Sequence, residues 1–155
     1  MALRATQSLP RGNRYFFMTL KGLKNDEGEK ALLDAFRPAE IIEIDKLTEG
    51  QAATALWAKK YLNPGEPLLI GACDHTILFD QKRFDQMTGE HSQSDALIFT
   101  YRRNPAVRRN PEAYGWVETD GGFRAKRVSV KAPLAGDPAG HHAIIGSFWF
   151  LKAGY

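Results

Sequence analysis

The sequence predicts an α/β protein that has a mixed sheet, flanking helices and a hairpin-rich second half. Strand and helix patterns alternate over residues 15–101, as is typical of parallel strands joined by right-handed helical crossovers. From residue 114 onward, three strand-like runs follow one another with no helical pattern between them. The dipeptide Asp120-Gly121 separates the first two of these runs and is a strong hairpin signal.

Apolar periodicity and helix-capping residues define the individual elements. Asp26 is expected to cap one helix, with Glu29 three residues later, and Thr48 and Gln51 are spaced as a capping box for the next. In the first half we expect strands over 15–20, 41–45, 68–70 and 96–101, and helices over 26–36, 48–62 and 81–87. In the second half the strand-like runs are 114–118, 122–130 and 143–151.

The segment over residues 68–74 is the most informative part of the chain. Its apolar run over 68–70 is continuous, which is typical of a parallel strand buried on both faces. Gly71 and Ala72 follow, and then Asp74, at the carboxyl end of the strand, where ligands bind in open α/β sheets. A carboxylate in this position suits Mg²⁺ that carries phosphate oxygens. The alternative is that Asp74 only caps the turn after the strand.

Composition and charge narrow the function classes. A chain of 155 residues buries enough surface to fold as one domain, and its 43% hydrophobic and 25% charged fractions are ordinary globular values. The lone Cys73 excludes an intramolecular disulfide and fits a reducing cytoplasm. No apolar stretch has the length of a membrane span. The net charge of +3 permits anionic substrates without requiring nucleic acid, and the aromatic residues lie mainly in apolar runs instead of among basic ones.

Arginines and histidines in the second half form two smaller clusters. Four arginines, at positions 102, 103, 108 and 109, occupy one predicted loop. Such a loop is usually a solvated surface, and the alternative is a contact with phosphate or nucleic acid. The pair His141-His142 lacks a third ligand at the spacing of a zinc site.

Residues 15–152 resemble the sugar nucleotidyltransferases, also called nucleoside-diphosphate-sugar pyrophosphorylases. The resembling segments follow the order of that family and are residues 41–45, 47–55, 68–74, 114–120, 128–133 and 143–150. The resemblance implies one Rossmann-like nucleotidyltransferase domain over residues 1–155, incomplete at both ends. It also implies transfer of a nucleotidyl group from a nucleoside triphosphate to a sugar-1-phosphate, with release of pyrophosphate and Mg²⁺ as cofactor.

The resemblance also assigns roles to individual residues. Gly50 lets the nucleobase approach the backbone and Gln51 pairs with its amide edge, although Gln51 also fits the capping box. Asp74 holds Mg²⁺ against the phosphates. The backbone of Gly115 meets the sugar hydroxyls, although a glycine within a strand also marks a bulge. Lys131 binds the sugar phosphate as a flexible point charge.

Two departures from the family pattern bear on activity. Ser129 and Val130 stand where the family commonly has glutamates, one of which holds the sugar ring, so the identity of the substrate is open. The sequence also leaves the base and the oligomeric state open. No Gly-rich, Arg-containing loop precedes Tyr15, and in the family the strand that carries this loop lies inside the sheet. We therefore expect impaired transfer by this chain alone, with unpaired strand backbone. The alternative is a non-catalytic nucleotide- or sugar-phosphate-binding domain.

Overall fold

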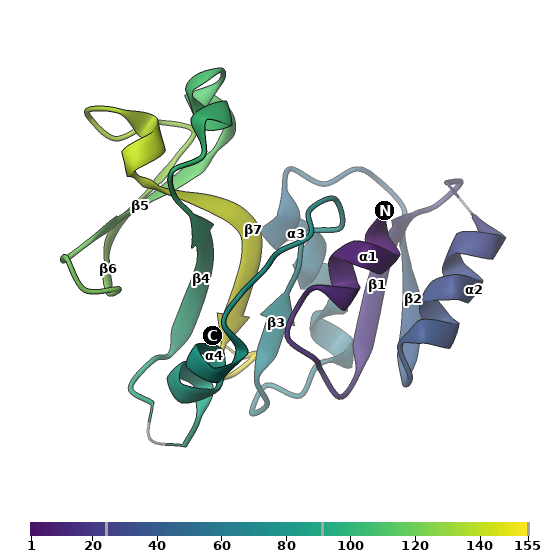
Figure 1. The fold of residues 1–155 in the computed structure, drawn as a ribbon. Helices are drawn as coiled ribbons and strands as arrows, with labels where there is room; N and C mark the ends of the chain where they lie inside the picture. Colours follow the sequence, from purple (N-terminus) through teal and green to yellow (C-terminus); the bar gives the residue numbers. More distant parts are fainter. Residues whose placement is uncertain (24, 91, 155) are drawn as a thin grey trace. The chain divides into compact units, whose positions relative to one another are not determined.

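The computed structural model describes residues 1–23, 25–90 and 92–154 of a mixed α/β protein (Figure 1). The chain forms two compact units. Unit 1 contains residues 1–97 and 148–155, and unit 2 contains residues 98–147. Within the described ranges, no helix is both long enough and apolar enough to cross a membrane.

Unit 1 contains most of the helices. Its elements are α1 (Ala2–Gln7), β1 (Tyr15–Leu20), α2 (Asp26–Ala35), β2 (Ala39–Ile44), α3 (Gln51–Ala55), the 3₁₀ helix η1 (Leu56–Tyr61), β3 (Leu68–Ile70) and α4 (Gln81–Thr88). β4 (Ala96–Tyr101) begins in this unit, and β7 (His142–Phe150) ends in it. The predicted bounds of β1 and β4 are confirmed, and those of α2 and α4 agree to within one residue. The helix α1 was not predicted.

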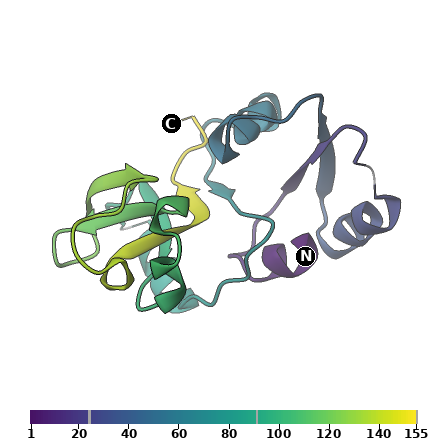
Figure 2. The same cartoon turned by 90° about the horizontal axis from the view of Figure 1, so that it is seen from above.

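The parallel pair β1–β2 carries helices on both faces. The two strands run in register from Tyr15 opposite Ala39 to Leu20 opposite Ile44, which confirms the predicted β-α-β unit. Successive side chains of a strand point to opposite faces. The Tyr15 ring accordingly packs on Phe36 after α2, with centroids 4.8 Å apart, while the Phe16 ring packs near Tyr61 of η1, at 5.8 Å. α1 and α2 lie on the first of these faces and α3 on the second (Figures 1 and 2).

The starts of the two predicted helices differ from expectation. Asn25, not Asp26, caps α2, because its side chain accepts the Gly28 N–H at 2.9 Å. The capping box at Thr48 and Gln51 is wrong. The N-cap of α3 is Gly50, which has no side-chain cap.

The predicted helix over 48–62 is also divided. The α-helix α3 has only 5 residues, and the chain continues directly as the 3₁₀ helix η1. The Thr48 hydroxyl, which was expected to bond to the first turn's amides, lies 2.5 Å from the Thr54 hydroxyl instead. Thr54 in turn donates to the Gly50 carbonyl. These hydroxyl contacts connect the residues before α3 with its first turn.

The orientation predicted for the strand over 68–70 is wrong. β3 pairs antiparallel with the end of β7, from Leu68 opposite Phe150 to Ile70 opposite Phe148, and its side chains are half-buried. β1 and β2 form a separate two-stranded sheet, and no ladder between described strands joins it to β3. A continuous apolar run specifies that a strand is covered, but it does not specify the partner or the direction of pairing.

The amino-terminal segment packs on the residues that follow β3. The Ser8 hydroxyl accepts the Ile77 N–H at 3.0 Å. At Gly71, the first residue after β3, a Cβ atom would lie 2.3 Å from Cδ1 of Leu9. The absence of a side chain at Gly71 is therefore what lets Leu9 lie against this backbone.

Unit 2 is built around a β-hairpin. The hairpin strands are β5 (Gly115–Thr119) and β6 (Ala125–Val130), and three 3₁₀ turns accompany them: η2 (Pro105–Arg108), η3 (Pro111–Ala113) and η4 (Pro138–Gly140). The predicted turn is confirmed: Asp120 N–H donates to the Arg124 carbonyl at 3.2 Å and Gly121 has a positive φ of 86°. β5 pairs with β6 on one side and with the start of β7 on the other, and β4 also pairs with β7. The core of the unit consists of Val107, Trp116, Ala139 and Ala143.

Candidate functional site

Gly50 and Gln51 occupy the amino-terminal end of α3. Gly50 has an extended backbone, and no heavy atom lies within 4 Å of the position that a Cβ would occupy. The backbone of Gly50 is thus open to the approach of a flat ligand. Gln51 is half-buried as the first residue of the helix. The nucleobase contact remains a prediction, and the open space beside Gly50 is the geometry that it requires.

Asp74 lies in a bend four residues after the end of β3, and its side chain is 58% exposed. Its carboxylate Oδ1 lies 2.7 Å from Nδ1 of His75. Among the residues that the structure describes, no three His, Cys, Asp or Glu side chains are grouped closely enough to hold a metal ion. Mg²⁺ is commonly bound by one or two carboxylates together with substrate phosphates. A single exposed carboxylate therefore suits a cation that arrives with a nucleotide better than one held by protein alone.

Gly115 and Lys131 lie beside each other in unit 2. The Lys131 N–H donates to the carbonyl of Tyr114, the residue before Gly115, at 3.1 Å. Lys131 is exposed, and its φ of 54° is uncommon for a residue with a side chain. The bulge considered at Gly115 is wrong, because the irregularity of this ladder lies between Glu118 and Thr119. The hairpin thus brings together the two residues predicted to contact the sugar phosphate.

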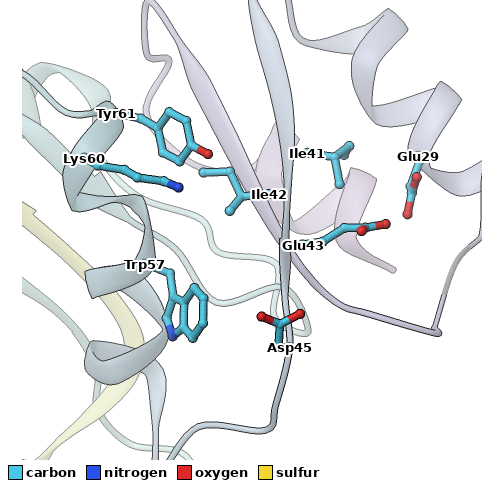
Figure 3. A pocket seen from close by; sticks show the side chains of 8 residues that line it. All are labelled: Glu29, Ile41, Ile42, Glu43, Asp45, Trp57, Lys60 and Tyr61. Carbon is cyan, nitrogen blue, oxygen red and sulfur yellow. The ribbon is translucent and has the colours of Figure 1, made fainter.

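A first cavity of about 520 Å³ lies beside β2, and none of the predicted site residues lines it (Figure 3). Its lining carries three carboxylates and one ammonium group, and the Lys60 ammonium lies 4.9 Å from the centre of the Tyr61 ring. The lining residues are Glu29, Ile41, Ile42, Glu43, Asp45, Trp57, Lys60 and Tyr61. The excess of negative charge disfavours a triphosphate, since like charges repel at short range. Sequence reasoning missed this cavity, and the alternation of acidic and apolar residues over 41–45 was its one visible signal.

A second cavity of about 490 Å³ lies between the amino-terminal segment and α4. It is lined by residues 7–11 and by Phe79, Gln81, Phe84 and Asp85. The Gln81 amide donates to the Asp85 carboxylate at 2.7 Å. Arg11 is the cation among the residues that line this cavity. None of the predicted site residues lines this cavity either.

Two of the four clustered arginines hold the turn η4. Arg108 donates twice to the carboxylate of Asp137, at 2.8 and 2.5 Å, and Arg102 donates to the Gly140 carbonyl at 3.3 Å. The hydrogen bonds from Arg108, followed by the bond from the Ala139 amide, lower the pKa of Asp137 to about 2. These contacts give the arginine loop a structural role in unit 2.

His142 and Tyr101 are the other perturbed groups of this unit. Nδ1 of His142 lies 2.9 Å from the Thr100 hydroxyl. Burial lowers the pKa of His142, and the nearby charges of Arg102 and His141 lower it further. Burial also raises the pKa of Tyr101, and its hydrogen bond with Tyr114 adds to this shift. The pKa shift favours the neutral form of the His142 imidazole.

The fold is similar to that of solved structures. The nucleoside-diphosphate-sugar pyrophosphorylase from Vibrio cholerae RC9 superimposes with a TM-score of 0.61 over 91% of this chain, at 15% sequence identity. The chain spans 55% of the length of that protein. No model of a known protein family matches the sequence. No curated protein matches it either. The similarity establishes a mixed α/β fold of the kind that this pyrophosphorylase has.

Proposed function

We propose that this chain is a Rossmann-like nucleotidyltransferase domain that binds a nucleoside triphosphate and a sugar-1-phosphate. The observation that carries the proposal is the fold shared with a nucleoside-diphosphate-sugar pyrophosphorylase over 91% of the chain. The exposure of Asp74 supports it, because an exposed carboxylate can contact a Mg²⁺ ion that carries the phosphates of a nucleotide.

Each proposed role has a local structural reason. Gly50 and Gln51 receive the nucleobase, where the backbone of Gly50 is open. Asp74 presents an exposed carboxylate toward Mg²⁺ and the phosphates. Lys131 and Gly115 take the sugar phosphate, and the bond from Lys131 N–H to the Tyr114 carbonyl fixes the backbone from which the lysine extends.

The reaction needs no nucleophile from the protein. An oxygen of the sugar-1-phosphate attacks the α-phosphorus in line, the bond to the bridging oxygen breaks, and pyrophosphate leaves with that bond's electron pair. The residues of this chain bind and orient the two substrates and place the Lys131 charge near the sugar phosphate. When bound, Mg²⁺ supplies positive charge to the phosphate oxygens.

A second candidate is a non-catalytic domain that binds nucleotides or sugar phosphates. The amino-terminal segment favours it. The amide of Gly12, the one glycine before β1, donates to the Tyr15 hydroxyl at 2.9 Å instead of facing outward toward an anion. Binding through Gly50, Gln51 and Asp74 does not require this segment, whereas charge neutralisation at the leaving pyrophosphate does in the resembled family.

Calorimetry with a panel of nucleoside triphosphates tests the shared part of both candidates. We expect binding of at least one nucleotide to strengthen with Mg²⁺, and Asp74→Asn to abolish most of this metal dependence. His75→Gln is the matched control, because it removes the imidazole beside Asp74 and keeps the carboxylate. Equal affinities with and without Mg²⁺ in all three proteins would refute the assignment of Asp74.

A further inference from the structure

The strand β6 forms an uncovered edge of unit 2. It pairs with β5 on one side, and no described strand pairs with its other side (Figure 1). Two of its apolar side chains are exposed, Val128 to 48% and Val130 to 73%. Edge strands with free backbone and exposed apolar side chains are templates for an added strand.

The hydrogen-bond pattern shows which backbone groups this edge presents. In an antiparallel pair, every second residue bonds to the partner strand and the residues between them point away from it. The Lys131 N–H donates to the Tyr114 carbonyl. Residues 129 and 127, two and four positions earlier in the register, therefore also direct their backbone groups toward β5. The N–H and C=O groups of Val128 and Val130 therefore point outward. An added strand would meet the backbone of the two exposed valines.

The charge along this edge selects the partner. Residues 123–132 contain four cations and no carboxylate: Arg124, Lys126, Arg127 and Lys131. Arg127 donates to Glu118 on β5 at 3.1 Å. The other three cations lie before and after the valines, so pairing with a second copy would bring together two edges of net positive charge. Like charges across a strand pair destabilise it, whereas opposite charges stabilise it.

We propose that the free edge of β6 binds an acidic, extended peptide segment of a partner protein as an added strand. Backbone bonds to Val128 and Val130 provide the pairing, and carboxylates flanking a β-branched centre face the cations at both ends. The proposal shares Lys131 with the proposed sugar-phosphate site, but its backbone pairing and its test variants leave Lys131 and the triphosphate-binding residues unchanged. Nucleic acid is disfavoured, because valine side chains offer no flat surface on which bases stack.

The probe is a fluorescein-labelled heptapeptide, Glu-Glu-Val-Thr-Val-Glu-Glu, and the readout is fluorescence anisotropy with the full chain. We expect saturable binding that weakens as salt rises above about 0.1 M, where the Debye length is about 10 Å. The same peptide with lysines in place of its glutamates should bind at least about tenfold more weakly, because charge complementarity sets partner choice.

Two protein variants separate backbone pairing from charge. Val128→Pro removes an outward N–H and leaves the bonds to β5 intact, since proline is tolerated where an edge N–H faces solvent. Its matched control is Val128→Thr, which keeps both the β-branch and the donor. The variant with Arg124→Glu and Lys126→Glu reverses charge without touching the valines, and circular dichroism checks that each variant is folded.

Peptide binding and self-association of these variants support or overturn the proposal. Loss of acidic-peptide binding in Val128→Pro but not in Val128→Thr supports strand addition, and a switch of preference to the lysine peptide in the charge-reversed variant supports the acidic partner. If Val128→Pro fails to fold, the peptide preference of the charge-reversed variant alone tests the proposal. Unchanged affinity in both variants overturns the proposal. Self-association in sedimentation experiments that Val128→Pro abolishes would assign the edge to a second copy instead.

Discussion

Ile144 on β7 fills the space beside Gly115 on β5. A Cβ at Gly115 would lie 2.9 Å from Cδ1 of Ile144 and 3.5 Å from its Cγ1. The pairing of Trp116 with Ala143 and of Val117 with His142 places these two residues next to each other in the same ladder. Packing alone therefore accounts for a glycine at a position where the resembled family uses a glycine backbone to meet a sugar.

Gly115→Ala is expected to destabilise the protein by about 1–3 kcal/mol, the usual cost of overpacking. Chemical denaturation measures this free energy of unfolding. Ile144→Val removes the Cδ1 atom that the new methyl group would meet, so the double variant should recover most of the loss. A double variant that is as unstable as the sum of the two single variants would show that the residues do not compete for this space.

The ion pair of Arg108 and Asp137 should make the stability of unit 2 fall at acid pH. The pKa of Asp137 is lowered from 3.8 to about 2 in the folded chain. A carboxyl whose folded pKa is depressed contributes stability above its unfolded pKa, and this contribution is lost as pH falls from about 4 through about 2. Thermal unfolding of wild type and Asp137→Asn should therefore differ at pH 7 and converge near pH 2. Curves that stay parallel down to pH 2 would contradict this role.

His142 should add a second, milder pH dependence. Its pKa is lowered from 6.5, so the unfolded chain binds a proton in a pH range in which the folded chain does not. Stability from this residue is present above pH 6.5 and declines as pH falls toward the folded pKa. His142→Gln should reduce the fall of the melting temperature below pH 6.5. The same slope in wild type and His142→Gln would exclude His142 as its source.

The 155-residue chain is expected to release pyrophosphate slowly or not at all. In the resembled family, amides and an arginine of a Gly-rich loop neutralise the leaving group, and removing one such donor commonly costs about 10²–10³ in rate. In this chain Leu9 packs on Gly71, and the Gly12 amide is bound by Tyr15. The assay combines a panel of nucleoside triphosphates and sugar-1-phosphates with Mg²⁺. Turnover on the order of 1–10³ s⁻¹ would show that the chain needs no such loop.

Local sequence signals predicted the elements better than their partners. β1 and β4 were predicted at their observed bounds because apolar, aromatic and β-branched runs between polar segments are specific for strands. α1 has no side-chain cap, and its Ala5 is 1% exposed. Packing therefore stabilises a helix that the local sequence pattern does not predict. The pairing of β3 with β7 joins residues about 80 positions apart, and no property of residues 68–70 encodes it.

For the candidate site, the sequence likewise predicted where residues lie along the chain but not which groups they contact. Sequence order located Asp74 after a strand and Lys131 after a hairpin. It did not reveal that His75 contacts the carboxylate or that Tyr114 fixes the lysine backbone, since these contacts depend on three-dimensional geometry. Charge patterning near β2 was visible in the sequence, but only the arrangement of α2 and η1 around the strand turns it into a cavity.

The fit of Leu9 against Gly71 has a consequence for how this protein can change over generations. A larger residue at position 71 would displace Cδ1 of Leu9, so the observed backbone accepts it when Leu9 takes another rotamer or when position 9 becomes smaller. Homologous sequences should therefore show the two positions varying together, with alanine or serine at 71 accompanied by a shorter side chain at 9. Such a record of paired substitutions would mark the contact between the amino-terminal segment and the strand exit as an inherited constraint.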